Sequence, residues 1–176
     1  IAVPLVTMCG REQLLMLEQL LFTIAVRWKR LPSIMVVSDG SVSESQIRKV
    51  LRWWPAGLQS ATWQEFSDFH RQRGRCELVR YAEKDRFGRK LAVILATAEQ
   101  RRVLWCDCDI LFFSDFSRTV EETGPGGPLL NAAQDSHYSY DPQLTAEVLA
   151  HLYRQAPVNT GLLLCEGSLY DAFRLR

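Results

Sequence analysis

The chain has 176 residues, of which 47% are hydrophobic, and its formal net charge is +1. This length and apolar content suit a single domain spanning residues 1–176 with a sizeable core. The balanced charge argues against a nucleic-acid partner, and the absence of any apolar run of about 18 residues excludes a predicted transmembrane helix.

The first third of the chain alternates between strand-like and helix-like patterns. Residues 2–8 form a short apolar run that predicts a buried strand, and residues 12–28 repeat apolar side chains at helical spacing. Residues 33–38 predict a second strand, closed by Asp39 and Gly40. Ser43 and Gln46 have the spacing of a capping box, which predicts a helix that ends near Pro55.

The remainder of the chain continues the same alternation. Further strands are predicted at 62–66, 102–112, 129–133 and 158–165, and helices at 67–75, 91–100 and 144–155. The segment 124–128, which contains three glycines and two prolines, predicts a loop. Strands alternating with helices indicate an α/β fold, in three α/β/α layers around a mostly parallel sheet.

Polar side chains follow three of the predicted strands. Ligands of such sheets bind at the carboxyl ends of the strands, so these positions are candidates for one binding crevice. They are Thr7, Met8 and Cys9 after the first strand, Asp39 and Gly40 after the second, and Asp107 and Asp109 later.

The segment 103–112 places two carboxylates, Asp107 and Asp109, inside a hydrophobic run. Two acids in an apolar setting are costly unless a cation or hydrogen-bond donors meet them. On an extended strand both would point to the same face, with Cys106 and Cys108 on the other. Paired carboxylates bind Mg²⁺ or Mn²⁺, usually together with substrate phosphates. Lys90, at the start of the preceding helix, would share the neutralisation of a leaving diphosphate.

The cysteines and arginines allow plainer interpretations. The five cysteines have no regular spacing, so they predict neither a disulfide framework nor a zinc site. They are expected to be small buried side chains. Their use indicates a reducing, cytoplasmic compartment, and a peripheral position at a membrane stays open. Eight basic residues lie between positions 71 and 90. They favour either a phosphate-bearing small molecule or a solvated helix surface.

These motifs together resemble the nucleotide-sugar glycosyltransferases of the GT-A fold, and most closely family 8, the group of glycogenin and bacterial galactosyltransferases. The similarity extends over nearly the whole chain. It rests on segments 2–10, 36–40, 103–113, 132–135 and 158–163, together with Lys90. Segment 103–113 resembles the family's metal-binding Asp-x-Asp strand, and Asn159-Thr160-Gly161 resembles its Asn-Ala-Gly sequence.

The resemblance implies a metal-dependent transfer of sugar from a nucleoside diphosphate sugar, with UDP-sugars favoured, to an unidentified acceptor. Family 8 would also imply retention of configuration. Asp109 and Asp107 would bind Mn²⁺ or Mg²⁺, and Asp107 would also approach the ribose. The nucleoside would lie near Thr7 and Asp39. Lys90 and Asp135 would contact the diphosphate or the donor sugar, and Asn159 would face the sugar and the acceptor.

The chain departs from the family pattern in one respect. The family's third metal ligand, a histidine in a C-terminal His-Gly-Lys-like motif, has no counterpart, because His70, His137 and His151 stand in other contexts. Either residues 1–176 lack the segment that supplies this ligand, or the third ligand is absent and metal binding is weaker. We also expect the acceptor-binding part to be missing from residues 1–176. Two other functions stay open: a catalytically silent nucleotide-sugar-binding domain, and a phosphatase with an Asp-x-Asp nucleophile.

Three candidate residues also have purely structural interpretations. Asp39 would cap a turn before Gly40, Asn159 would be a satisfied residue at a strand edge, and Asp135 would belong to a polar loop. The pair of Asp107 and Asp109 differs, since a structural role would leave two neighbouring acids without an evident partner.

Overall fold

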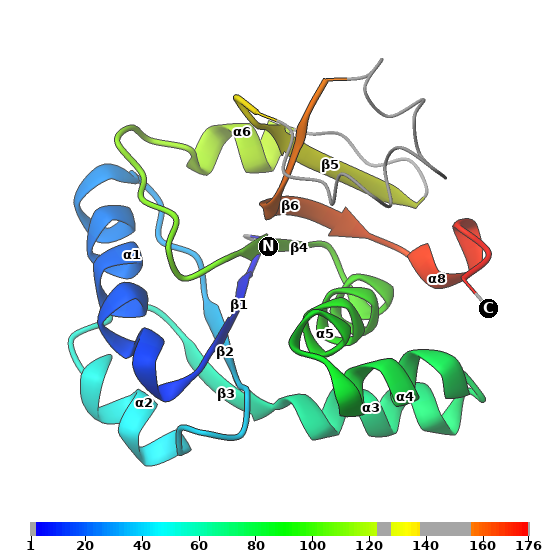
Figure 1. The fold of residues 1–176 in the computed structure, drawn as a ribbon. Coiled ribbons are helices and arrows are strands. Elements are labelled where there is room, and N and C mark those ends of the chain that lie inside the picture. The colour runs from blue at the N-terminus through cyan, green and yellow to red at the C-terminus, as the bar shows by residue number, and fades with distance from the viewer. Residues whose placement is uncertain (1–2, 123–127, 138–155, 176) are drawn as a thin grey trace.

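The computed structural model describes residues 3–122, 128–137 and 156–175. Its centre is a six-stranded sheet (Figure 1) with the order β3-β2-β1-β4-β6-β5. The strands are β1 (Leu5–Cys9), β2 (Ile34–Ser38), β3 (Leu58–Thr62), β4 (Val103–Cys106), β5 (Leu129–Gln134) and β6 (Val158–Glu166). β1 to β4 pair in parallel, whereas β6 runs antiparallel to both β4 and β5. The mostly parallel α/β fold is therefore confirmed.

Helices cover both faces of the sheet, which gives the three predicted layers. In Figure 1, α1 and α2 lie on one side and α3, α4 and α5 on the other. The helical elements are η1 (Arg11–Gln13), α1 (Leu14–Arg27), α2 (Glu44–Val50), α3 (Trp63–Gln72), α4 (Cys76–Lys84), α5 (Arg86–Gln100), α6 (Ser117–Glu122) and α8 (Leu169–Ala172).

Alternation along the strands divides the core into two clusters. Leu5 and Leu104 face the cluster that contains the buried side of α1. Their neighbours Val6 and Trp105 face the cluster that contains α5. Adjacent strand residues point to opposite faces of a sheet, so both faces of these strands must be apolar. This requirement explains the continuous hydrophobic runs in the sequence.

The helix starts follow local capping chemistry. Ser43 and Gln46 form the predicted capping box of α2, with Ser43 Oγ 3.3 Å from the Gln46 amide nitrogen. Asp85 accepts a hydrogen bond from the Phe87 amide at 2.7 Å and starts α5 five residues before the predicted residue 91. α4 was not predicted, although its apolar residues Leu78, Val79 and Ala82 have helical spacing.

The strand predicted at residues 62–66 is wrong. β3 ends at Thr62, and α3 begins at the next residue. The Glu65 carboxylate accepts hydrogen bonds from both the Thr62 amide, at 2.8 Å, and the Thr62 hydroxyl, at 3.1 Å. This side-chain cap favours a helix start over further strand.

The strand predicted at residues 102–112 is also too long. β4 ends at Cys106, and the segment after it turns, with the Ile110 amide donating to the Asp107 carbonyl at 3.2 Å. Strand alternation therefore does not orient Asp107 and Asp109. The strands at 129–133 and 158–165 are confirmed by β5 and β6. The predicted helix 144–155, which contains His151, and most of the loop at 124–128 lie outside the described residues.

The cysteines behave largely as predicted. All five are free, and four are buried, whereas Cys76 is exposed. In the described parts of the chain, no helix has the length and apolarity needed to cross a bilayer.

A buried polar cluster joins α3 to α5. The His70 ring donates from Nε2 to the Ala92 carbonyl at 2.9 Å, and its Nδ1 faces Arg75 Nη1 at 3.3 Å. Arg75 in turn binds Glu99 at 2.7 Å. Burial lowers the pKa of His70 below its ordinary value of 6.5.

Acid should therefore destabilise the fold through His70. A lowered folded-state pKa means that the stabilising contribution is complete above about pH 6.5 and is lost as the pH falls through the folded-state value. We expect the difference in melting temperature between pH 7.5 and pH 5 to be smaller in His70→Gln than in the wild type. Equal acid sensitivity in the two proteins would contradict this assignment.

Thiol reactivity should follow burial. Burial raises the pKa of Cys165 to about 12 and also raises that of Cys106, so neither forms a thiolate at pH 8. We expect Cys76 to react with iodoacetamide in the folded protein, and Cys106 and Cys165 only after unfolding. Peptide mass spectrometry of the alkylated chain measures this order, and early modification of Cys106 would contradict it.

Candidate donor-binding site

Two cavities meet at Asp107 and Asp109. The larger, of about 650 Å³, lies between the loops after β1 and β2 and the start of α5. The smaller, of about 310 Å³, lies beside β6 and the end of β5. Both carboxylates line both cavities. Strand alternation was predicted to point Asp107 and Asp109 to the same side. The turn after β4 does this instead, because it presents both carboxylates to the space where the two cavities meet.

Asp107 is fixed by three neighbours. Its amide donates to the Gly161 carbonyl at 2.7 Å. Lys90 Nζ lies 2.7 Å from its Oδ2 atom, and Trp105 Nε1 donates to its Oδ1 atom at 2.8 Å. Lys90 is also 5.6 Å from the centre of the Trp105 ring. A carboxylate with a charged partner and a second donor is strongly oriented. Asp109, by contrast, is exposed.

The larger cavity is formed where the loops after β1 and β2 touch. A Cβ atom on Gly10 would lie 2.4 Å from Asp39 Oδ2, so only glycine permits this approach. Asp39 Oδ1 accepts hydrogen bonds from the amide and the hydroxyl of Ser41, at 2.8 and 2.6 Å. Asp39 therefore caps the predicted turn and also lines the cavity, together with Met8 and Lys90.

Two of the predicted donor contacts lie apart from this surface. Thr7 is fully buried, and its hydroxyl lies 3.3 Å from Cys108 Sγ. Cys9 is also fully buried, and its thiol donates to the Gly10 carbonyl at 3.2 Å. Neither residue lines either of the two cavities. Both support the loops that do.

The smaller cavity collects the predicted sugar-facing residues. Asp135 and Asn159 line it with Asp107 and Asp109. The Gly161 amide donates to Asn159 Oδ1 at 2.7 Å, and a Cβ on Gly161 would lie 2.8 Å from that oxygen and 3.2 Å from Asp107 Oδ2. Gly161 therefore provides the space in which the Asn159 amide and the Asp107 carboxylate approach each other.

The metal-binding potential is limited to oxygen ligands. Among the described residues, no three His, Cys, Asp or Glu side chains cluster closely enough to hold an ion. Asp107 and Asp109 offer carboxylate oxygens, which suit Mg²⁺ or Mn²⁺ when phosphates complete the coordination. Burial raises the pKa of Cys106, which keeps this thiol protonated and unsuited to zinc.

Seven of the eight basic residues of segment 71–90 divide into two groups. Arg71, Arg73, Arg75 and Arg80 form ion pairs with acids on the surrounding helices. Other members line the larger cavity, namely Arg86, Arg89 and Lys90. Arg89 also donates to the Asp39 carbonyl at 3.2 Å and stacks over Trp63. The first group, apart from the buried Arg75, fits the interpretation as a solvated helix surface. The second group lies where a phosphate-bearing small molecule could bind.

Sequence reasoning missed several residues that line the larger cavity. They are Gly10, Arg11, Glu12, Gln13, Ser41 and Trp105. Glu12 and Gln13 were assigned to the start of the predicted helix 12–28, although the four residues after β1 lie at the carboxyl end of a parallel strand. Their position at the end of a strand could have identified them, because ligands of such sheets bind there.

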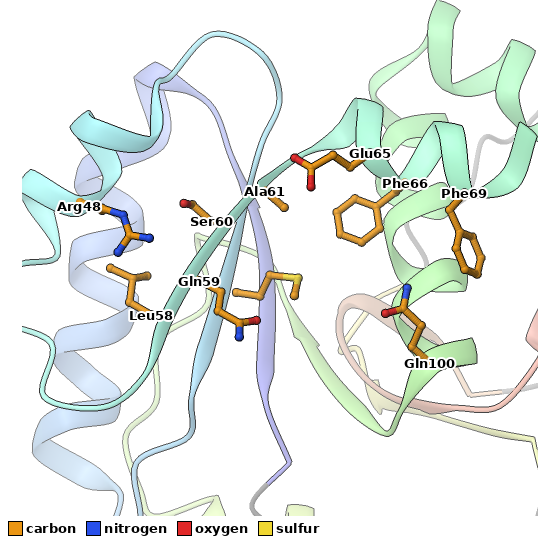
Figure 2. Close-up of a pocket in the computed structure, with 10 residues that line it drawn as sticks. Arg48, Leu58, Gln59, Ser60, Ala61, Glu65, Phe66, Phe69 and Gln100 are labelled. Atoms are coloured by element: carbon orange, nitrogen blue, oxygen red, sulfur yellow. The ribbon is translucent and has the colours of Figure 1, made fainter.

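A third cavity, of about 440 Å³, lies at the edge strand β3 (Figure 2). Figure 2 shows Gln59 and Ser60 of β3 opposite Phe66 and Phe69 of α3. The two charged side chains that line this cavity already have partners within the protein. Glu65 caps α3, and Arg48 pairs with Glu44 at 2.6 Å. None of the predicted site residues lines it.

Known proteins resemble this chain in structure but not in sequence. No protein-family model and no curated protein matches the chain. Mouse xyloside xylosyltransferase 1, in its apo form, superposes with a TM-score of 0.67 and 13% identity, over 99% of this chain and 69% of that one. The galactosyltransferase LgtC, in complex with donor and acceptor sugar analogues, gives 0.61 and 13%, over 97% and 60%.

The chain has the GT-A glycosyltransferase fold. A further GT-A structure, the glycosyltransferase GlyE of Streptococcus pneumoniae TIGR4, has a TM-score of 0.58 and 16% identity, over 98% of this chain and 36% of its own. The predicted GT-A fold is thus confirmed, whereas membership of family 8 remains a prediction. The chain spans only part of the length of each of these GT-A structures.

The ion pair between Lys90 and Asp107 should contribute measurably to stability. The Lys90 side chain is 15% exposed and that of Asp107 33% exposed, so solvent screens this pair only in part. In a double-mutant cycle of Lys90→Met and Asp107→Asn we expect a coupling of about 1–2 kcal/mol in the free energy of unfolding, measured in urea. The exposed pair Arg48 and Glu44 is the control, and its coupling is expected to be clearly smaller because solvent screens it. Equal couplings would refute the prediction.

Proposed function

We propose that the chain binds a nucleoside diphosphate sugar, with UDP-sugars favoured, and transfers the sugar to an acceptor with the help of Mn²⁺ or Mg²⁺. One observation supports this function above the others. Asp107 and Asp109 stand at the junction of a larger cavity with basic residues on its wall and a smaller cavity lined by polar groups. A donor molecule has the same order of parts: nucleoside and diphosphate, then sugar.

The larger cavity would hold the nucleoside and diphosphate. Lys90 and Arg86 line it from α5, and Asp39 and Met8 line it from the loops after the strands. The cationic side chains would bind phosphate oxygens, and Asp39 would face the nucleoside. Thr7 and Cys9 would act only through the loops that they support, because they are buried behind this surface.

The smaller cavity would hold the sugar. Asp135 and Asn159 would hydrogen-bond its hydroxyl groups, and Gly161 leaves room for the ring beside Asp107. In the transfer, the bond from the sugar C1 to the phosphate oxygen breaks and C1 bonds to an acceptor oxygen. The nucleoside diphosphate leaves with the electron pair of the broken bond, and the proton of the acceptor hydroxyl passes to its departing phosphate oxygen. Asn159 and Asp135 would orient C1 toward the acceptor.

Asp107 and Asp109 would hold the metal, and their oxygen atoms fit Mg²⁺ or Mn²⁺. The bound ion would neutralise negative charge on the departing diphosphate. Lys90 now occupies Asp107 Oδ2 at 2.7 Å, so metal binding to that atom requires Lys90 to move away from it. The diphosphate would give Lys90 a new partner in the same cavity.

Donor binding should stabilise the protein only when metal and nucleotide are both present. With Mn²⁺ and UDP near 100 times their Kd, we expect the melting temperature to rise by about 5–10 °C. Asp109→Ala should abolish the rise by removing an exposed carboxylate oxygen. Glu77→Ala, which removes an exposed carboxylate that lines neither cavity, should retain it. No rise with any nucleoside diphosphate in the wild type would refute the proposal.

Turnover separates the remaining functions. Release of UDP from UDP-sugars, monitored with and without candidate acceptors, would indicate transferase activity, whereas a melting shift without release would indicate a silent binding domain. The lack of a third metal-ligating side chain among the described residues favours this second candidate. Trapping of an aspartyl-phosphate analogue with beryllium fluoride would instead favour the phosphatase.

A further inference from the structure

The outer surface of α1 is unusually apolar. The helix buries Leu17, Leu20, Leu21 and Ile24 against the sheet. On its outer side, Leu15 is 64% exposed, Phe22 61% and Val26 58%. A surface helix normally presents charged or polar residues on this side, and a helix that is apolar all round normally has a partner there. The described residues leave this surface open to solvent.

The exposed residues have the spacing of a helix-pairing surface. Leu15, Gln19, Phe22 and Val26 are all exposed, and they follow one another at intervals of four, three and four. These intervals are those of the a and d positions in paired helices. We call these four residues the outer stripe. A polar residue such as Gln19 within such a stripe specifies the register of pairing at some cost in stability.

The charges on α1 and its start, apart from Arg11, favour an antiparallel partner. Glu12 and Glu18 lie toward the N-terminal end, and Arg27 ends the helix. None of the three forms an ion pair with another described residue. Antiparallel pairing would bring acids of one copy near the arginine of the other, and would also oppose the two helix dipoles. Parallel pairing would bring like charges together.

We propose that α1 is the interface with a second copy of this chain, in an antiparallel two-fold dimer. The two-fold axis would pass between Gln19 and Phe22, so that Phe22 of each copy lies against Gln19 of the other and Leu15 against Val26. The same surface then serves both partners, as two-fold symmetry requires.

The loop after Asp109 enlarges this interface. The Phe112 amide donates to Thr23 Oγ1 of α1 at 3.1 Å, which holds the loop against the helix. On either side of Phe112, Leu111 is 43% exposed and Phe113 80% exposed. In the proposed dimer these side chains, on a loop held to α1 at Thr23, would add apolar area that a helix of only 14 residues cannot provide alone.

A second copy accounts for this surface better than an anionic membrane does. A membrane-binding helix carries an excess of Lys and Arg beside its apolar face. Here Glu12 and Glu18 lie on α1 or next to it, and Arg30 beyond its C-terminal end is already paired with Glu121 at 2.7 Å. The mixed charges suit a partner that has the same charges in reverse order.

Sedimentation velocity over a range of protein concentrations tests the proposal. We expect the wild type to approach twice the 20.2 kDa mass of one chain as its concentration rises. Phe22→Glu should weaken the association at least about tenfold, because it places two like charges near the symmetry axis. Gln19→Leu should strengthen it several-fold by removing the polar residue from the stripe.

Tyr81→Glu on α4 is the matched control, since this aromatic residue is 44% exposed in the opposite helix layer. It should associate like the wild type, and circular dichroism should show that all variants are folded. A wild type that stays monomeric at every concentration would overturn the proposal, as would a dimer that Phe22→Glu leaves intact. Phe22-dependent binding to anionic phospholipid vesicles by a monomeric wild type would also overturn it, in favour of a membrane.

Discussion

The position of Asp107 depends on the pairing of β4 with β6. At this point the sheet changes from parallel to antiparallel, and Cys106 is the last residue of β4, opposite Leu162. The next backbone contact, from the Asp107 amide to the Gly161 carbonyl at 2.7 Å, ends the strand and begins the turn. Without the antiparallel strand, the two carboxylates would have no fixed relation to Asn159. The strand reversal thus builds one site from segments more than 50 residues apart.

The apolar surroundings explain why Asp107 needs such close support. Its flanking residues Cys106 and Cys108 are buried, and an unpaired carboxylate there would be costly. Lys90 and Trp105 each bind one of its oxygens, so the side chain is neutralised and oriented before any ligand arrives. Preorganised charge of this kind reduces the reorganisation that binding requires. The same contacts mean that an incoming cation must compete with Lys90.

The sequence predicted the layers of the fold better than the local geometry. Apolar runs identified most strands, since the two-sided burial of a parallel sheet leaves a strong pattern. The turn after Cys106 was missed because residues 110–112 are as apolar as a strand, and only tertiary packing on α1 shows why: Phe112 is buried against Trp28. The start of α3 was missed although Thr62 and Glu65 carried a capping signal. Thr7 was expected at a strand end, but it is the middle residue of β1, and it is buried there because both faces of this strand are covered.

The loop from Asp109 to Phe113 connects the candidate site with α1. One of its ends carries a carboxylate of the candidate site, and the other lies on α1, held there by the hydrogen bond from Phe112 to Thr23. If a second copy covers α1, thermodynamic linkage requires that any effect of dimerisation on donor affinity be matched by an equal effect of the donor on dimerisation. In that case, occupancy of the crevice would depend on protein concentration.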